Sequence, residues 1–209
     1  DRLDVLINNA ATIPQTRLET KDGFEMQFGV NHLAPFLLTN LLLEQIGKSN
    51  ISRIVNVSSV GHRFGKIYFD DLQFTKKTYN KLVVYTQSKL ANILFTYELA
   101  DKLKNTTITV NCLDPGHVKS DIGVYKDGGL SQFVFRTLLR PIHKTPEEGA
   151  DTSIYLATSP DVKGITGKYF SNRKMRKTSP LTYKKDLAAQ LWNTSAQMVG
   201  LKNVVFNKK

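Results

Sequence analysis

Segments typical of β-strands alternate along this chain with segments that have helical periodicity. The runs 3–9, 51–57 and 107–113 are short, apolar and rich in β-branched residues, which predicts buried strands. Apolar residues recur at steps of mostly three or four over 22–46 and 82–103, which predicts helices between those strands. This alternation is typical of a parallel sheet with right-handed crossovers, so we expect an α/β fold.

The remainder of the chain continues the same pattern. A proline followed by two glutamates opens the run 146–156, which suits the first turn of a helix. The run 165–170 predicts a last short strand, and 182–199 predicts a terminal helix. With 209 residues and 41% hydrophobic residues, the chain is long enough for a single domain over 1–209.

Turns follow each of the first three predicted strands. They carry Asn8-Asn9-Ala10, Ser58-Ser59 and Pro115-Gly116. Ligands of open α/β sheets bind outside the carboxyl ends of the strands. We therefore expect the functional site of this chain where these turns meet.

The segment YTQSK places Tyr85 and Lys89 four residues apart on a predicted helix. Residues at this spacing share one helix face, so both side chains can point at one ligand. An ammonium group near a phenol favours the phenolate, and we expect Lys89 to lower the pKa of Tyr85. The pair is a candidate for proton transfer, although tyrosine and lysine are also ordinary helix residues.

Composition excludes several classes of site. Cys112 is the one cysteine, so there is no internal disulfide and no cysteine zinc motif, which fits a reducing, intracellular compartment. No metal-ligand spacing links His32, His62 and His117, and we expect them to be satisfied polar or surface side chains. The apolar run 33–43 is too short to span a membrane.

The formal net charge of +11 is spread along the chain rather than gathered in a recognised nucleic-acid-binding module. We therefore expect no nucleic-acid partner. The basic cluster 172–177 reads as a solvated loop, with contact to a membrane surface or a partner as the alternative.

Five motifs in order make the sequence resemble the short-chain dehydrogenase/reductase family. They are the NNAA turn at 8–11, Asn31 in a helix, Ser59 after a strand, the YTQSK helix, and the Pro-Gly turn at 115–116. Longer phrases, such as RIVNVSSVGHRFGKI and NCLDPGHVKSDI, resemble the retinol dehydrogenase branch. The resemblance covers nearly the whole chain and implies a Rossmann-type, doubly wound parallel sheet.

The resemblance also implies catalytic roles. Tyr85 would exchange a proton with the substrate oxygen, and Lys89 would hydrogen-bond the nicotinamide ribose. Ser59 would hold the substrate oxygen, and Asn31 would order a proton relay behind the lysine. Ser59 is preferred to Ser58 because the family motif places the catalytic serine three residues after the asparagine, here Asn56.

The implied cofactor is NADP, favoured by the branch resemblance, with NAD as an open alternative. Asn9 and Ala10 would line its adenosine side. The turn Pro115-Gly116, with Val118 and Ser120, would meet the nicotinamide amide and the phosphates. Tyr85 and Lys89 would also contact the cofactor. Ala11 stands where the family usually has glycine.

The family's glycine-rich turn, which cradles the cofactor pyrophosphate, has no match in this sequence. We therefore expect the chain to be the C-terminal two-thirds of one domain, lacking the first three strands. The strand over 5–9 would then be an open apolar edge, and the isolated chain would bind cofactor poorly and be inactive. An N-terminal membrane anchor is common in the branch that the sequence resembles, and the resemblance leaves its presence in a full-length protein open. Such an anchor would place the protein at the cytosolic face of the endoplasmic reticulum or at another intracellular membrane.

The expected substrate is a lipophilic alcohol or its carbonyl, retinol or retinal in type. The apolar stretch 121–143 would supply much of the substrate wall, although a core helix or a dimer face would show the same composition. The predicted helix 82–103 is a candidate homodimer face. The alternative function is a non-catalytic relative that acts as a binding or regulatory protein.

Overall fold

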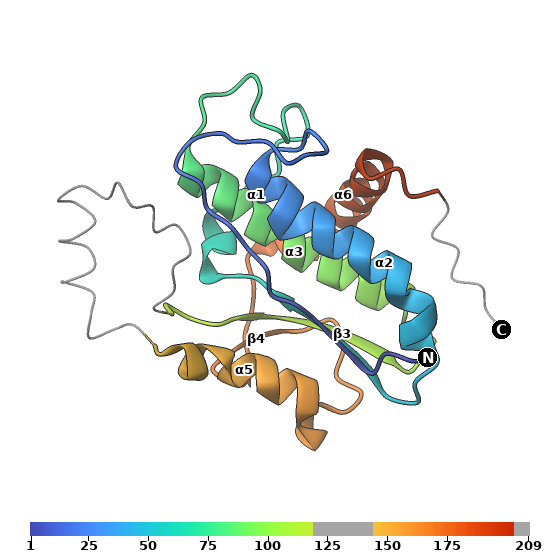
Figure 1. Ribbon diagram of the computed structural model, residues 1–209. Coiled ribbons are helices and arrows are strands. Elements are labelled where there is room, and N and C mark those ends of the chain that lie inside the picture. The colour runs from blue at the N-terminus through green and yellow to red at the C-terminus, as the bar shows by residue number, and fades with distance from the viewer. Residues whose placement is uncertain (119–143, 203–209) are drawn as a thin grey trace.

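Five strands form a single sheet in the computed structural model, which describes residues 1–118 and 144–202 (Figure 1). The spatial order of the strands is β1-β2-β3-β4-β5. The first four pair in parallel, and β5 is antiparallel to β4. Their bounds are β1 Val5–Asn8, β2 Ser52–Val57, β3 Ile108–Asp114, β4 Tyr169–Ser171 and β5 Lys174–Met175. The predicted α/β fold with a mainly parallel sheet is confirmed.

Helices cover both faces of this sheet. Figure 1 shows α1 (Met26–Phe28), α2 (Ala34–Gly47) and α3 (Lys81–Lys102) on one face, and α5 (Pro146–Thr158) on the other. Helix α6 (Lys185–Met198) packs on the outside of α3. The sheet is therefore the middle layer of the fold, with a layer of helices on each face.

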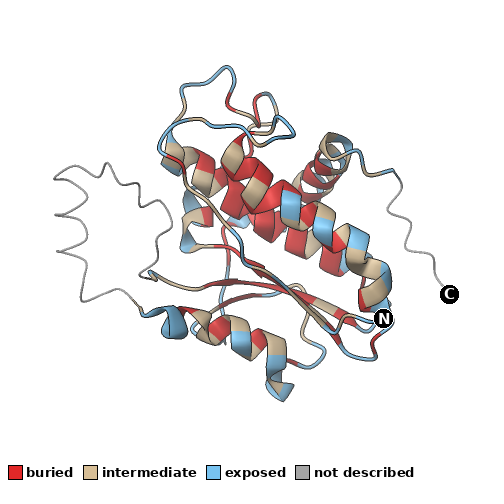
Figure 2. Ribbon diagram, in the orientation of Figure 1, coloured by how far each residue is buried: buried red, intermediate tan, exposed pale blue. Residues whose placement is uncertain are grey.

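Helix α3 is the most deeply buried helix of the described chain. Every residue from 87 to 96 is buried, and Figure 2 shows this helix mostly in red. Phe95 packs against Phe36 of α2 and Trp192 of α6, with ring centroids 5.2 Å and 5.9 Å away. The middle of α3 is thus covered by this chain itself, with α6 packed against it, and a homodimer contact through this helix stays a prediction.

Two predicted helices begin later than their periodicity suggested. The helix expected over 22–46 begins at Met26, where the Glu25 carboxylate accepts the backbone N–H groups of Gln27 and Phe28. It then passes through one π-helical turn, η1 (Gly29–Leu33), before α2. The terminal helix expected from 182 begins at Lys185, after the 3₁₀ turn η5 (Pro180–Tyr183).

The strand expected over 165–170 also begins late. Gly164 and Gly167 have φ of 74° and 63°, a conformation that interrupts an extended strand, and β4 starts at Tyr169. The basic cluster 172–177 is exposed and forms the turn and the second strand of a β4–β5 hairpin. Its exposure agrees with the predicted solvated segment, and contact with a membrane surface or a partner stays the alternative.

Strand β1 lies at the edge of the described sheet and pairs only with β2 there. Its side chains are partly exposed, and Ile7 is 40% exposed. The described residues thus show the apolar edge that was expected. Over 1–118 and 144–202, no helix has the length and apolar character that a bilayer crossing requires.

Gly65 tests how closely the 3₁₀ turn η2 (Val60–Phe64) approaches α3. A Cβ atom at Gly65 would lie 2.5 Å from the Thr86 carbonyl oxygen, which is backbone and cannot rotate away. We expect Gly65→Ala to lower the free energy of unfolding by about 1–3 kcal/mol, measured by urea denaturation. Gly47→Ala is the matched control, because nothing lies within 4 Å of its Cβ position. Equal effects of the two substitutions would contradict a tight contact between η2 and α3.

Candidate active site

The carboxyl ends of β1 and β2 are joined by asparagine side chains. The parallel register places Asn8 beside Asn56. The Asn8 amide donates to Asn56 Oδ1 at 2.7 Å and to Thr39 Oγ1 of α2 at 2.9 Å. Asn56 in turn donates to Thr96 Oγ1 of α3 at 2.9 Å. These bonds fix the strand ends against the helices that carry the candidate site residues.

The two serines that follow β2 point in different directions. The buried Ser58 hydroxyl donates to the Lys89 carbonyl at 2.8 Å, so it attaches the turn to α3. Ser59 is extended and caps η2, with its Oγ accepting the Gly61 N–H at 3.1 Å. Ser59 lies near enough to the Tyr85 phenol to lower its pKa, and both side chains lie beside Gly61. The geometry therefore supports Ser59, rather than Ser58, as the serine that faces the candidate proton-transfer group.

Tyr85 and Lys89 lie together on α3, as their spacing predicted. The Lys89 Nζ is 5.6 Å from the Tyr85 ring centroid and donates to the Val57 carbonyl at 3.2 Å. Lys89 is 2% exposed, and this burial lowers its pKa to about 8, with the Asp114 carboxylate opposing the shift. The ammonium thus lies at the end of β2 with little solvent around it.

The pKa of Tyr85 shifts in the opposite direction to the one expected. Burial of the phenol raises this pKa above its ordinary value, and the nearby Asp114 carboxylate acts in the same direction. Ser59 lowers the pKa, but by less than burial raises it. The prediction that Lys89 brings the pKa of Tyr85 down is wrong for this arrangement, in which Lys89 Nζ bonds to Val57.

Asn31 lies in the π-helical turn η1 and is buried beside α3. Its Oδ1 accepts the Thr12 N–H at 2.7 Å, and its Nδ2 donates to the Thr12 carbonyl and to Ser88 Oγ, both at 3.1 Å. Asn31 therefore ties the segment after β1 to the residue preceding Lys89. Its place behind Lys89 and its part in a proton relay stay predictions.

The sequence model of the short chain dehydrogenase family matches residues 1–127. This chain belongs to the short-chain dehydrogenase family. Human retinol dehydrogenase 14 is 50% identical over 201 residues, which are 96% of this chain and 60% of that protein. Human retinol dehydrogenase 13 is 44% identical over 206 residues, covering 96% and 62%. The chain thus spans about three-fifths of the length of these relatives.

A solved structure shows the same fold. The crystal structure of an uncharacterized protein from Mycobacterium paratuberculosis has a TM-score of 0.75 and 31% sequence identity, and the match covers 95% of this chain and 68% of that one. The chain is therefore a retinol dehydrogenase-like member of the short-chain dehydrogenase family, and its fold is Rossmann-like.

The residues predicted to contact the family's cofactor follow β1 and β3. Asn9 and Ala10 are exposed just beyond β1. Pro115 and Gly116 follow β3, and Gly116 has a φ of 82°, which favours glycine. Val118 pairs with Lys144 and packs where a Cβ on Gly149 would lie. Ser120 and the predicted substrate wall 121–143 lie outside the described residues.

The described residues fit the nicotinamide half of such a cofactor. Lys89 Nζ uses one of its three N–H donors, on Val57, and keeps two for ribose hydroxyls. Gly116 is partly exposed, and the Lys144 side chain lies over it, 3.2–3.3 Å from where a Cβ atom would be. The Lys89 donors at the end of β2 and the Gly116 turn after β3 lie at the same edge of the sheet.

Two of the three histidines named from the sequence are buried and hydrogen-bonded, as expected. His32 Nε2 lies 2.8 Å from Ser195 Oγ, and its Nδ1 lies 3.3 Å from Asn92 Oδ1. His62 bonds to backbone groups of Ser59 and Ser179. His117 is exposed. Across 1–118 and 144–202, no three His, Cys, Asp or Glu side chains are arranged to hold a metal ion.

Sequence reasoning missed Asp114 as a member of the site. This carboxylate is 8% exposed at the end of β3, and its charge acts on both Tyr85 and Lys89. Its Oδ1 accepts the Gly116 N–H at 3.2 Å. An aspartate before a Pro-Gly turn reads as an ordinary turn residue, so only the parallel pairing of β2 and β3 reveals its position.

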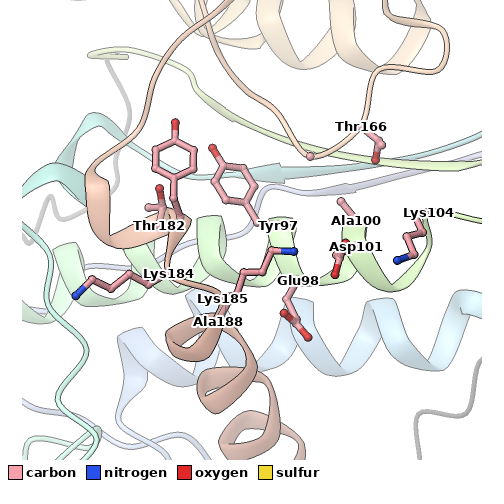
Figure 3. A pocket seen from close by; sticks show the side chains of 12 residues that line it. Tyr97, Glu98, Ala100, Asp101, Lys104, Thr166, Thr182, Lys184, Lys185 and Ala188 are labelled. Atoms are coloured by element: carbon pink, nitrogen blue, oxygen red, sulfur yellow. The ribbon is translucent and has the colours of Figure 1, made fainter.

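A cavity of about 350 Å³ lies away from these residues, between the C-terminal half of α3 and the start of α6 (Figure 3). Tyr97 and Tyr183 stack in its wall with ring centroids 5.8 Å apart. Lys104, Lys184 and Lys185 also line it. None of the predicted site residues does so, and the cavity is separate from the candidate active site.

Lys89→Met tests the stability cost of the buried ammonium. At pH 7 the native state holds a charge whose pKa burial has lowered to about 8 from 10.5. We expect the substitution to raise the free energy of unfolding at pH 7 by about 1–3 kcal/mol. A lysine with a lowered native pKa is most costly below that pKa, so the gain should shrink as the pH rises from 8 toward 10.5. Urea denaturation at several pH values measures this change.

Lys104→Met is the matched control for this experiment, because Lys104 is exposed. It should change stability by less than about 0.5 kcal/mol at every pH. A loss of stability in Lys89→Met at pH 7 would mean that the bond to Val57 outweighs the cost of burying the charge.

Proposed function

We propose that this chain is the catalytic part of a single short-chain dehydrogenase domain that interconverts a lipophilic alcohol and its carbonyl with NADP as the preferred cofactor. The observation that carries the proposal is the placement of Ser59 beside Tyr85, with Lys89 one helical turn along α3. These three side chains offer two groups for a substrate oxygen and a cation for the adjoining ribose.

The Tyr85 phenol is in the protonated state that carbonyl reduction requires. The raised pKa of Tyr85 means that the phenol holds its proton at neutral pH, so it can donate that proton to a carbonyl oxygen. Ser59 donates a second hydrogen bond to the same oxygen and keeps it beside the phenol. In alcohol oxidation the same proton returns to Tyr85. The nicotinamide, when bound, supplies or accepts the hydride.

The remaining roles in the cofactor site follow from position. Lys89 would bind the nicotinamide ribose through its two unused N–H groups, and Asn9 and Ala10 would line the adenosine side. Pro115, Gly116 and Val118 would flank the nicotinamide amide, together with Ser120. Asn31 would keep α3 and the segment after β1 aligned around Lys89.

A lipophilic substrate is supported by apolar side chains around the catalytic turn. Val60 and Phe64 belong to η2, which directly follows Ser59, and Phe64 is 84% exposed. Leu82, one helical turn before Tyr85, is 60% exposed. The names of the similar human proteins make retinal the first substrate to test. A homodimer and an endoplasmic reticulum location stay predictions, as does the preference for NADP over NAD.

Tyr85→Phe tests the proposed function, because it removes the proton and keeps the ring. Turnover of all-trans-retinal with NADPH and with NADH would be measured on the 209-residue chain. It would also be measured on a fusion that adds the glycine-rich nucleotide segment of human retinol dehydrogenase 14. We expect turnover in the fusion, little in the chain alone, and a loss of about 10²–10⁴-fold in kcat for Tyr85→Phe. Cofactor affinity should change by less than about threefold.

Tyr155→Phe is the matched control, since Tyr155 packs against Phe170 beneath the sheet, away from Ser59. It should keep full turnover. If Tyr85→Phe keeps turnover within about threefold of the starting protein, Tyr85 is not the proton donor. Bound cofactor without turnover of any carbonyl would favour the non-catalytic relative.

A further inference from the structure

His62 joins the turn that carries Ser59 to a segment more than a hundred residues further along the chain. Its side chain is fully buried. Nδ1 lies 2.7 Å from the Ser59 carbonyl oxygen, and Nε2 lies 3.3 Å from the Ser179 backbone nitrogen. The Arg63 guanidinium adds a second link to the same segment by donating to the Lys177 carbonyl at 2.7 Å.

The two partners of His62 determine its protonation state. A carbonyl oxygen can only accept a hydrogen bond, so Nδ1 must carry the proton that points at Ser59. A backbone N–H can only donate, so Nε2 must be unprotonated to accept from Ser179. His62 is therefore neutral and in the Nδ1–H tautomer. His32 is different, because a hydroxyl group and an amide are its partners and a hydroxyl can donate or accept.

The contact with the Ser59 carbonyl also affects the Ser59 hydroxyl. The same carbonyl accepts the backbone N–H of His62 at 3.1 Å, so one residue holds it twice. This closes the turn and places the Gly61 N–H on Ser59 Oγ at 3.1 Å. Gly61 occupies one of the two acceptor positions of the Ser59 hydroxyl, and the hydroxyl proton is left for an oxygen beside Tyr85.

We propose that His62 is the positioning residue of the active site: in its neutral Nδ1–H form it holds the Ser59 hydroxyl at Tyr85 and anchors the catalytic turn to Ser179. This inference rests on the proposed function, because it assigns how that site is kept in order. A protonated His62 would present an N–H group to the Ser179 N–H, and the two donors would repel each other. The link is therefore lost in acid.

The groups around His62 agree with a neutral ring. Burial is the largest influence and lowers the pKa of His62. The hydrogen bond to Ser59 raises that pKa, Arg63 on the same turn lowers it, and Asp114 at the end of β3 raises it. From β4, the Tyr169 ring packs edge-on with centroids 5.1 Å apart. The net lowering keeps His62 neutral at pH 7, and the link is lost as the pH falls through the lowered pKa.

Nuclear magnetic resonance tests this inference without any need for turnover. Long-range ¹H–¹⁵N spectra of the 209-residue chain at pH 7 should show His62 as the Nδ1–H tautomer, assigned by the signal missing from His62→Phe. The ring should titrate below the ordinary histidine value of about 6.5. An Nε2–H tautomer, or a titration at or above that value, would overturn the proposal.

Three substitutions separate the two contacts of His62. Asparagine keeps an N–H near the position of Nδ1, glutamine keeps an acceptor near the position of Nε2, and phenylalanine keeps neither. In the fusion described above, we expect His62→Gln and His62→Phe to lower kcat for all-trans-retinal by about 10–100-fold. His62→Asn should lower it by less than about fivefold. The apparent KM for the cofactor should stay within twofold in all three. Protonated His62 keeps Nδ1–H on Ser59 and loses only the link to Ser179, as His62→Asn does, so protonation should lower kcat by no more than the loss seen in His62→Asn.

The ¹³Cζ chemical shift of Tyr85 reports hydrogen bonding of its phenol. It allows the three His62 variants to be compared in the 209-residue chain, where no turnover is needed. It should change in His62→Gln and His62→Phe and stay near the wild-type value in His62→Asn. Ser179→Ala is the control, since the contact uses the Ser179 backbone and not its hydroxyl. Equal effects of the asparagine and glutamine variants, or a wild-type Tyr85 signal in His62→Phe, would overturn the positioning role. Absence of turnover with the Tyr85 shifts as expected would overturn only the proposed function.

Discussion

Three buried hydrogen bonds between the end of β2 and the middle of α3 determine where the candidate site lies. Ser58 donates to the Lys89 carbonyl, and both Lys89 Nζ and Asn92 Nδ2 donate to the Val57 carbonyl. In a dry interior each of these polar groups would be costly to leave unpaired, so strand and helix are held in one relative position. Ser59 directly follows Ser58, and Tyr85 lies one helical turn before Lys89. The same bonds therefore bring Ser59 and Tyr85 near each other.

The burial that orders the site also lowers the stability of the fold, because it places the Lys89 ammonium group in the interior. Helix α3 is covered by the sheet, α2 and α6 over ten consecutive residues, and Lys89 is within that stretch. A core position would normally hold an apolar side chain, yet here it holds an ammonium group with one protein partner. Retaining such a group where it reduces stability is understandable if its charge is needed by a ligand.

The strands and the helix face of the site could be predicted because their causes are local. Apolar runs between turn residues placed β1, β2 and β3 to within two residues, and the i, i+4 spacing placed Tyr85 and Lys89 together. The start of α1 was missed because Glu25 is an unusual capping residue. The direction of the Tyr85 pKa shift was missed because spacing does not reveal that Lys89 Nζ bonds to Val57. The role of His62 depends on Ser179, and no local pattern connects the two.

The family match ends at residue 127, but the site is also held from beyond that point. The Ser179 N–H binds His62, which in turn bonds to the turn that carries Ser59. Ser195 of α6 bonds to His32, whose other nitrogen faces Asn92, and Asn92 donates to the end of β2. His32 thus connects the C-terminal segment to Asn92 of α3, and His62 connects it to the turn that carries Ser59. A change in the segment 178–198 can therefore alter the site geometry without touching a motif residue.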